Sequence, residues 1–271
     1  MSIIQQVLLW IYALFKKIGL LETAWFKKIF YWAYFFYKKH IEDPFFGLTQ
    51  QYPELFKGGH ILDVGANIGY TATLFSQVIT SGFQVYAFEP ETKNIDSLRE
   101  ILNIYHLIGQ VIPIQAAVGA EKGTIELWHN ETHHADHRIL TNTYKSSGVA
   151  LQEVSQVTLL SIDDFVQNEL NNGAIKFIKI DVQGYELPVC LGMEKTLQNN
   201  PDAAIVLEYM PSMITELGFI PQEILDFFQK RGYFMYVLDQ GGKLLKADLA
   251  IIKQEIKKRT YIDLVFTHKL I

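Results

Sequence analysis

From Gly59 onward, short apolar runs alternate with segments in which apolar residues recur at helical spacing. The apolar runs predict strands over residues 60–64, 84–88, 111–118, 124–128, 154–160, 177–180, 203–207, 233–238 and 261–266. The helical spacing predicts helices over residues 70–79, 92–105, 163–170 and 221–231. Strands that alternate with helices in this way indicate an α/β domain built on a doubly wound, mainly parallel sheet.

The first 40 residues follow a different pattern, in which lysine pairs recur every 11 residues. The pairs begin at Lys16, Lys27 and Lys38, and an aromatic residue precedes each of them. Because an 11-residue step is close to three helical turns, a helix stacks these pairs along one stripe. A separate apolar stripe follows 3/4 spacing through Ile11, Leu14, Ile18, Leu21, Trp25, Ile29, Trp32 and Phe36. We therefore expect an amphipathic helical segment over residues 1–40, ahead of a main domain over residues 41–271.

Two interpretations of residues 1–40 stay open. Lysine beside Trp and Tyr is typical of the interfacial layer of an anionic membrane, which predicts peripheral contact with a membrane surface. The other interpretation is packing on the main domain or on a second subunit. A spanning helix is not expected, because the longest uncharged run, residues 1–15, falls short of the roughly 18 apolar residues that a span needs. Those residues also lack the basic start and the small-residue cleavage site of a signal peptide.

Charge is unevenly divided along the 271 residues. The net charge is −5, but residues 1–40 carry +5, so the remainder carries −10. An acidic main domain argues against nucleic-acid binding, which needs a basic surface. The single cysteine, Cys190, excludes an intrachain disulfide and favours a reducing compartment. We expect a cytoplasmic protein, placed peripherally on the inner face of the membrane if residues 1–40 bind lipid.

Four carboxylates fall at or near the ends of predicted strands: Asp63, Glu89, Asp181 and Glu208. In a doubly wound parallel sheet the carboxyl ends of the strands share one edge, and ligands bind in the crevice there. These four residues are therefore expected to surround one crevice.

The loop after the first predicted strand carries the most informative motif, I-L-D-V-G-A-N-I-G-Y-T-A over residues 61–72. Gly65 permits a tight turn and close approach of a ligand to the backbone. Gly69 lets the next helix pack near the strand and aim its N-terminus at the ligand. Glu89 follows 20 residues after Gly69, where a carboxylate can accept hydrogen bonds from two ribose hydroxyls. In this strand-loop-helix-strand context the motif predicts a site for a nucleoside-type cofactor.

The glycine spacing distinguishes between two such cofactors. The nicotinamide fingerprint is G-x-G-x-x-G, whereas this loop reads G-A-N-I-G without the third matching glycine. S-adenosylmethionine (SAM) brings an amino acid and a sulfonium but no phosphate, so it does not need that closer glycine packing. Asp63 followed by G-x-N-x-G resembles motif I of the class I SAM-dependent methyltransferases. A nicotinamide-dependent Rossmann oxidoreductase stays the alternative.

Further segments resemble the FkbM family of methyltransferases. They are F-E-P at 88–90, A-A-V-G at 116–119, D-H-R at 136–138, V-T-L-L-S-I-D-D-F at 157–165, I-K-I-D-V-Q-G-Y-E-L at 178–187 and L-E-Y at 207–209. The resemblance implies a Rossmann-like class I methyltransferase fold with a seven-stranded sheet. It also implies O-methylation of a free hydroxyl on a sugar, glycan or secondary metabolite. Gln183 departs from the family pattern, in which Glu is common at that position.

The resemblance assigns roles around SAM. The expected cofactor-binding residues are Asp63, Gly65, Asn67, Gly69, Glu89 and Ala117. The two glycines and the asparagine would hold the methionine part of SAM, and Asp63 would lie near its ammonium or order the loop. Glu89 would bind the ribose, and Ala117 would flank the edge of the adenine.

Two residues are expected to act on the acceptor. Asp181 ends a strand beside the expected methyl group, where its carboxylate can contact the SAM ammonium, orient a hydroxyl or serve as general base. Its alternative role is a cap for the next helix. His137 is the second catalytic candidate, because histidine titrates near neutral pH. The adjacent Arg138 can bind a substrate carboxylate or phosphate, or pair with an acid of the same domain.

Glu186 and Glu208 complete the expected substrate-binding set, and each can bind substrate hydroxyls or act as an ordering carboxylate. No metal is expected, because the spacing of the candidate ligands matches no standard motif: His133, His134, Asp136 and His137. The last alternative is a catalytically inactive membrane-surface binding protein, against which the intact carboxylates of the crevice argue.

Overall fold

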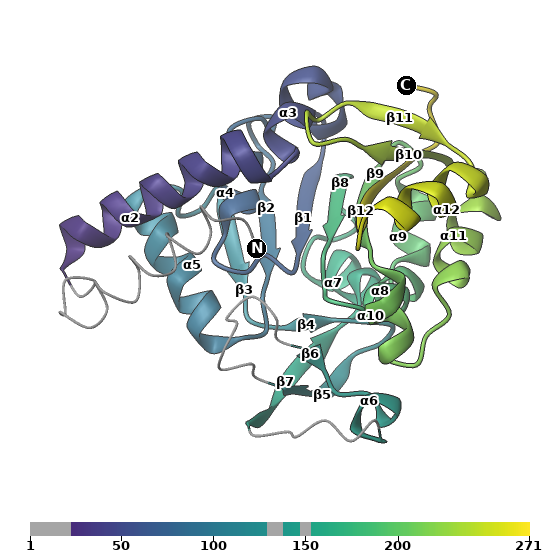
Figure 1. Ribbon diagram of the computed structural model, residues 1–271. Coiled ribbons are helices and arrows are strands. Elements are labelled where there is room, and N and C mark those ends of the chain that lie inside the picture. Colours follow the sequence, from purple (N-terminus) through teal and green to yellow (C-terminus); the bar gives the residue numbers. More distant parts are fainter. Residues whose placement is uncertain (1–22, 129–137, 147–152) are drawn as a thin grey trace. The chain divides into compact units, whose positions relative to one another are not determined.

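The computed structural model describes residues 23–128, 138–146 and 153–271. The chain divides into two compact units, Met1–Asp43 and Pro44–Ile271 (Figure 1). In the first unit, helix α2 spans Ala24–Tyr37 and continues into a short π-helical segment, Lys38–Glu42. The apolar residues Trp25, Ile29, Trp32 and Phe36 are exposed at 3/4 spacing along α2. Among the described residues no helix is both long and apolar enough to cross a membrane.

The second unit is built on an eight-stranded sheet with the order β11-β10-β12-β9-β8-β1-β2-β3 (Figure 1). Its strands are β1 (His60–Val64), β2 (Val85–Phe88), β3 (Val111–Ile114), β8 (Ile175–Ile180), β9 (Ala204–Tyr209), β10 (Phe234–Leu238), β11 (Leu244–Ala247) and β12 (Ile262–Thr267). Neighbouring strands are parallel from β3 to β9, and β12 is antiparallel to both β9 and β10. The doubly wound, mainly parallel sheet predicted from the sequence is confirmed.

The sheet differs from the expected seven strands by one. Strand β11 extends the edge as an antiparallel hairpin partner of β10. The hairpin turn is closed by Asp239, whose Oδ1 accepts hydrogen bonds from the N–H groups of Gly241 and Lys243. β11 has four residues, too short a run to distinguish from a loop by its pattern.

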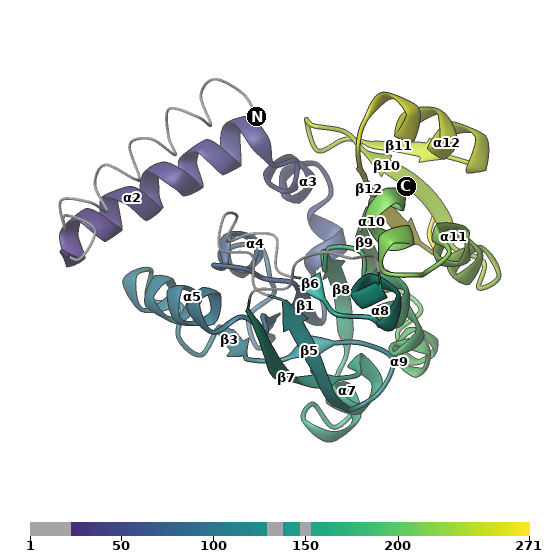
Figure 2. The same cartoon turned by 60° about the horizontal axis from the view of Figure 1, so that its bottom comes forward.

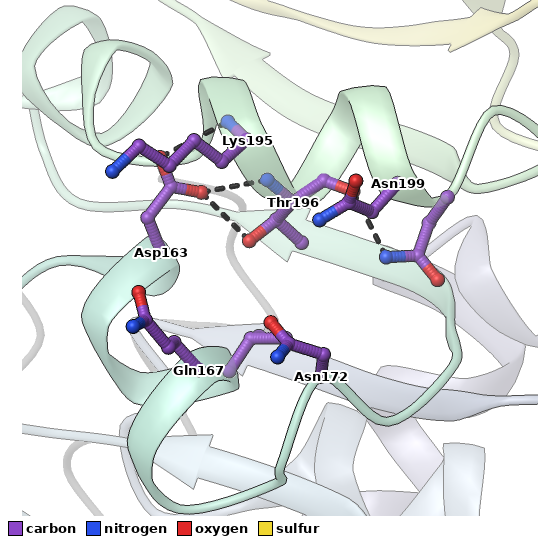
Figure 3. A pocket seen from close by; sticks show the side chains of 8 residues that line it. Asp163, Gln167, Asn172, Lys195, Thr196 and Asn199 are labelled. Atoms are coloured by element: carbon purple, nitrogen blue, oxygen red, sulfur yellow. Dashed lines mark hydrogen bonds between the residues drawn. The ribbon is translucent and has the colours of Figure 1, made fainter.

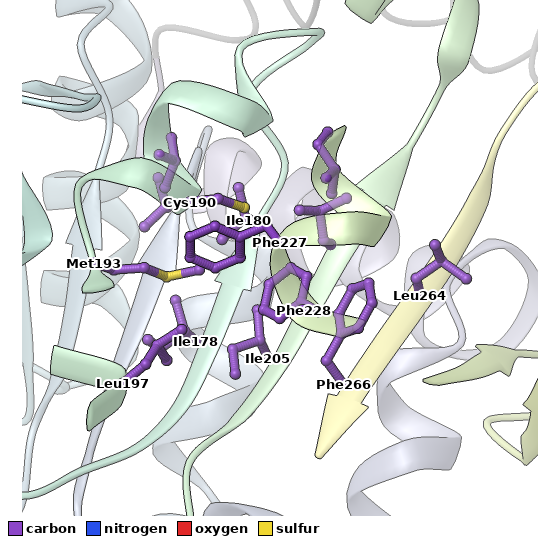
Figure 4. Packing of buried hydrophobic residues seen from close by; sticks show 14 of the residues in the cluster. Ile178, Ile180, Cys190, Met193, Leu197, Ile205, Phe227, Phe228, Leu264 and Phe266 are labelled. Atoms are coloured by element: carbon purple, nitrogen blue, oxygen red, sulfur yellow. The ribbon is translucent and has the colours of Figure 1, made fainter. Parts of the chain in front are cut away.

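Helices cover both faces of the sheet because alternate strand residues point to opposite faces. One face packs against α3 (Phe45–Gln51), the 3₁₀ turn Pro53–Phe56, α4 (Tyr70–Ser76) and α5 (Thr92–Ile104). The other packs against α7 (Ile162–Asn168), α8 (Glu186–Leu191), α9 (Glu194–Asn199), α11 (Pro221–Gln229) and α12 (Leu249–Lys258). Figure 4 shows Phe227 and Phe228 of α11 among Ile205, Leu264 and Phe266 of this second face.

A second sheet has the order β4-β7-β5-β6 and comes forward in Figure 2. Its strands are β4 (Ala117–Val118), β5 (Gly123–Trp128), β6 (Arg138–Ile139) and β7 (Val154–Leu160), with α6 (Asn142–Ser146) after β6. The strand predicted over 111–118 is therefore two strands of different sheets. The second sheet packs on Val182 and Tyr185, in the loop after β8, and on Leu217, directly after α10 (Pro211–Glu216). It thus lies against the carboxyl end of β8.

Candidate active site

The four strand-end carboxylates lie on adjacent strands. Glu89 follows β2, Asp63 is the fourth residue of β1, Asp181 follows β8 and Glu208 is the fifth residue of β9. Since β2, β1, β8 and β9 are neighbours in the parallel part of the sheet, the four residues follow one another along its carboxyl edge. The four residues predicted to surround one crevice thus share one edge of the sheet.

The loop between β1 and α4 approaches β8 so closely that only glycine fits. Gly65 has a φ of +79°, and a Cβ on it would overlap the carbonyl oxygen of Asp181. The N–H of Asp181 in turn donates to the carbonyl of Val64, at 3.0 Å. Gly69 has a φ of +91°, and a Cβ there would overlap the Leu98 side chain on α5. Steric overlap therefore requires glycine at both positions, and at Gly65 it allows the loop to lie directly against the backbone of Asp181.

Every backbone N–H of the loop from Gly65 to Gly69 has an acceptor within the protein. The first two donate to the carbonyl of Phe88, at 3.0 and 2.9 Å, and Gly69 donates to Ala66 at 2.8 Å. Asn67 donates to Glu89 Oε2 at 2.9 Å, while its own side-chain oxygen accepts from Ile68 at 2.7 Å. The loop therefore offers no spare N–H donor of the kind that a pyrophosphate requires.

Glu89 is buried behind this loop. Its Oε1 accepts the N–H of Glu91 at 3.0 Å and lies 3.4 Å from Asn94 Nδ2, and its Oε2 accepts the N–H of Asn67. Burial raises the pKa of Glu89 to about 7, although these hydrogen bonds oppose the shift. Three of the four carboxylate lone pairs have protein donors, which leaves room for one ribose hydroxyl rather than the two expected.

Asp63 is fully buried and belongs to a network inside the loop. Its Oδ2 accepts from Thr71 Oγ1 at 2.6 Å, and its Oδ1 lies 3.4 Å from Lys179 Nζ, an ion-pair distance. Burial raises the pKa of Asp63, while the Lys179 ammonium and the Thr71 hydroxyl oppose that shift. Of the two roles considered for Asp63, this geometry supports ordering of the loop.

Lys179 is a further buried residue of this network that the sequence motifs did not predict. It lies on β8 opposite Asp63 in the sheet register, and its Nζ is also 3.4 Å from Asp181 Oδ2. The available signal was a lysine inside the apolar run I-K-F-I-K-I of a central parallel strand, where both faces are normally buried.

Asp181 is more accessible than the buried Asp63 and Glu89, with a side chain 36% exposed. Gln183 has a φ of +55°, and its Nε2 lies 3.1 Å from Asp181 Oδ1 and 3.4 Å from Glu208 Oε2. The neutral amide at this position thus bridges two acids. Burial, followed by the charges of Asp181 and Asp263, raises the pKa of Glu208 well above its usual value.

Glu186, at the start of α8, faces inward. Its Oε1 accepts the N–H groups of Val182 at 3.2 Å and of Gly184 at 3.0 Å. Burial raises its pKa to about 7, and its Oε2 has no hydrogen-bond partner among the described atoms. The geometry supports an ordering carboxylate that holds the loop after Asp181, rather than a contact to substrate.

The remaining candidates lie on the second sheet. Ala117 is buried in β4, opposite Leu159 of β7. Arg138 in β6 forms an ion pair with Glu216 of α10, with Nη1 and Oε2 2.7 Å apart. The acid-pairing alternative for Arg138 is thus the one observed. His137 and the other candidate metal ligands, at 133, 134 and 136, lie outside the described residues.

A separate polar pocket lies between α7 and α9, away from the carboxylates of the crevice. Figure 3 shows Asp163 of α7 facing the start of α9. Its carboxylate accepts the N–H groups of Lys195 and Thr196, at 3.0 and 2.7 Å, and the Thr196 hydroxyl at 2.7 Å. Asp163 therefore caps α9 from the neighbouring helix, which is a structural role.

Counted from the β3 edge, the first five strands, β3-β2-β1-β8-β9, follow the 3-2-1-4-5-6 order of dinucleotide-binding folds. The sheet then departs from that order, because the antiparallel strand β12 lies between β9 and β10. Together with the glycine loop and Glu89 it defines a Rossmann-like domain of the class I methyltransferase type. The family model of the methyltransferase FkbM domain matches residues 63–235. The chain therefore belongs to the FkbM family of methyltransferases, which confirms the resemblance of its motifs.

Individual proteins similar to this chain are methyltransferases. Hexuronic acid methyltransferase AglP of Haloferax volcanii is 30% identical over 138 residues, which make up 51% of this chain and 51% of that protein. The chain thus spans about half the length of this curated relative. The crystal structure of methyltransferase FkbM from Methylobacillus flagellatus KT has a TM-score of 0.48 at 15% identity, covering 78% of this chain and 44% of that one. A SAM-dependent methyltransferase from Aquifex aeolicus has a TM-score of 0.43 at 13% identity, covering 85% and 91%.

Proposed function

We propose that this protein is a SAM-dependent O-methyltransferase that acts on a hydroxyl of a sugar or glycan. The observation that carries the proposal is the loop from Gly65 to Gly69, placed over the carboxyl ends of β1 and β8 with Glu89 behind it and Asp181 beside it. Membership of a methyltransferase family supports the reaction class.

The residues present fit SAM better than a nicotinamide dinucleotide. The loop N–H groups from 65 to 69 are satisfied within the protein, so they suit a ligand without phosphate. Glu89 keeps one lone pair for a ribose hydroxyl. Gly65, Asn67 and Gly69 would face the methionine part of SAM, and Ala117 would flank the adenine. When bound, SAM supplies a methyl group activated by its sulfonium.

The protein's own contribution is to position the acceptor oxygen and remove its proton. The Asp181 carboxylate is fixed on both oxygens, by Gln183 and by Lys179, so it is suited to orient a group in the crevice. We assign the proton-accepting role to Asp181 or to His137. Glu208, whose pKa is raised, would donate a hydrogen bond in its protonated form to a substrate oxygen.

A sugar acceptor is supported by the name of the Haloferax volcanii relative, a hexuronic acid methyltransferase. Arg138 offers a second, chemical reason. Its side chain is 14% exposed beside the more open Glu216, so a carboxylate on an acidic sugar would find a guanidinium already held in place.

A methyl-transfer assay tests this function. The full chain is incubated with SAM and with neutral hexoses, hexuronic acids or a catechol, and formation of S-adenosylhomocysteine (SAH) is measured. We expect turnover with at least one sugar, and a loss of about 100-fold or more in Asp181→Asn, the scale of a lost proton-transfer group. His137→Ala should lower turnover while leaving SAH affinity unchanged. Methylation of the catechol alone would contradict a sugar acceptor.

We also propose that the first unit contacts an anionic membrane surface. Trp25 and Trp32 are each 61% exposed, and lysine pairs follow at 27–28 and 38–39. Exposed tryptophans beside lysines suit the headgroup layer of such a membrane. A membrane-bound enzyme of this kind would meet a lipid-linked glycan at its own surface.

A further inference from the structure

A buried cation lies at the centre of the crevice edge. The side chain of Lys179 is 5% exposed, and its ammonium donates a 2.8 Å hydrogen bond to the carbonyl oxygen of Gly65. The same Nζ lies 3.4 Å from Asp63 Oδ1 and 3.4 Å from Asp181 Oδ2. One ammonium thus contacts the turn of the glycine loop, the acid beneath it and the carboxylate that faces the crevice.

Burial of this charge needs a reason. An ammonium removed from water costs several kcal/mol unless it is paired, and a central parallel strand normally carries an apolar residue there. Burial lowers the pKa of Lys179, but the neighbouring Asp181 and Asp63 carboxylates outweigh it and raise the pKa overall, so the ammonium stays charged. Asp63 alone would suffice for a purely structural pair. The two further contacts of Lys179, to Gly65 and Asp181, reach groups at the edge where the crevice is predicted.

The orientation of Asp181 follows from these contacts. Lys179 lies against Oδ2, and the amide of Gln183 lies 3.1 Å from Oδ1, so each oxygen has its own donor. The carbonyl oxygen of Asp181 lies directly against Gly65, and the carbonyl oxygen of Gly65 accepts a hydrogen bond from Lys179. Movement of the lysine would therefore affect the loop and the carboxylate together.

We propose that Lys179 is a positioning residue that fixes the Asp181 carboxylate and the Gly65 turn for the amino-acid part of the cofactor. This inference rests on the proposed use of SAM. An ionised amino-acid group carries an ammonium that a fixed carboxylate can bind, whereas the adenosine part lacks that charge. Lys179 should therefore matter for the amino-acid part of the ligand and not for the adenosine part.

Two ligands separate these parts. SAH contains the amino-acid group, and 5′-methylthioadenosine has the same nucleoside and thioether without it. We expect Lys179→Met to weaken SAH binding to the full chain by about tenfold or more, equivalent to ~1.4 kcal/mol. The Kd of methylthioadenosine should change by no more than about twofold. The Kd of methylthioadenosine divided by the Kd of SAH should therefore fall. A matched control is Lys176→Met, on the same strand, whose Nζ lies 3.2 Å from the Asp202 carbonyl and away from the crevice.

Loss of the cation leaves Asp63 buried without its partner, so Lys179→Met can also destabilise the fold. The double variant Asp63→Asn/Lys179→Met removes both buried charges and keeps the measurement interpretable. We expect the double variant to regain thermal stability without regaining the preference for SAH.

The outcomes are distinct. Equal weakening of both ligands in either variant, or wild-type SAH affinity in the double variant, would overturn the positioning role and leave Lys179 as a structural ion. A wild-type protein that binds neither ligand would contradict the proposed function itself, and this inference with it.

Discussion

Glu89 and Asp63 are both buried carboxylates at the ends of adjacent strands, but their hydrogen-bond and ion-pair partners differ. Asp63 contacts a hydroxyl and an ammonium, so its charge is used within the protein. Burial raises the pKa of Glu89 to about 7, and the N–H and amide groups that donate to this carboxylate only partly offset the effect. Protonation of Glu89 should therefore change near neutral pH.

Cofactor affinity should consequently depend on pH through Glu89. A ribose hydroxyl donates to the ionised carboxylate, and protonation removes acceptor capacity. We expect SAH affinity to be highest above about pH 8 and to fall below pH ~7, by up to about tenfold per pH unit. Calorimetry across this range measures it. Glu89→Gln should weaken binding by about 2 kcal/mol at high pH and abolish the Glu89-dependent part of the slope. A wild-type slope in that variant would remove Glu89 from the ribose site.

Residue roles could be predicted only where a motif or a strand end marks them. Asp63, Glu89, Asp181 and Glu208 were expected at one edge because parallel strands share their carboxyl ends, and in the structure all four lie along that edge. Lys179 was missed because pairing across β1 and β8 is a long-range property. The inward orientation of Glu186 likewise depends on the turn at Val182 to Gly184, which sequence spacing does not specify.

At the scale of elements, the strongly periodic segments were predicted well and the breaks between them were not. The helix expected over 92–105 is α5, Thr92–Ile104, and the strand expected over 60–64 is β1. The run at 111–118 predicts one strand because it is apolar except for Gln115, but the chain leaves the main sheet at that residue. Helix α12 was not predicted, although Leu249, Ile252 and Ile256 follow helical spacing and pack on the core.

The contact between α7 and α9 gives a prediction at this scale. Asp163 satisfies two N–H groups and one hydroxyl at the start of α9. We expect Asp163→Ala to lower the free energy of unfolding by about 1–2 kcal/mol, as loss of a helix cap does, with SAH affinity unchanged. Denaturant unfolding measures the change. Asp164→Ala, which removes the neighbouring acid of the same turn, is the matched control, and an equal loss there would contradict the capping role.

At the scale of the whole molecule, charge and exposure distinguish the two units. The acidic body carries the crevice, and the basic segment before it presents an apolar stripe on α2. Its lysine pairs, and not its hydrophobicity alone, predict a preference for anionic lipid.

A vesicle flotation assay tests that preference. The full chain should float with vesicles that contain phosphatidylglycerol and much less with pure phosphatidylcholine. Trp25→Ser/Trp32→Ser should reduce flotation about tenfold or more, since each large side chain contributes roughly 1.5–3 kcal/mol when buried. Ile108→Ser, which replaces an exposed apolar residue of the second unit, is the control. Equal flotation of wild type and the double variant would end the membrane proposal for α2.

The central claim is that the crevice binds SAM rather than a nicotinamide dinucleotide. Calorimetric titration of the full chain with SAH, and separately with NADH, tests it most directly. The loop from Gly65 to Gly69, with its N–H groups already bonded, predicts micromolar binding of SAH and no binding of NADH. Binding of NADH without binding of SAH would contradict the account.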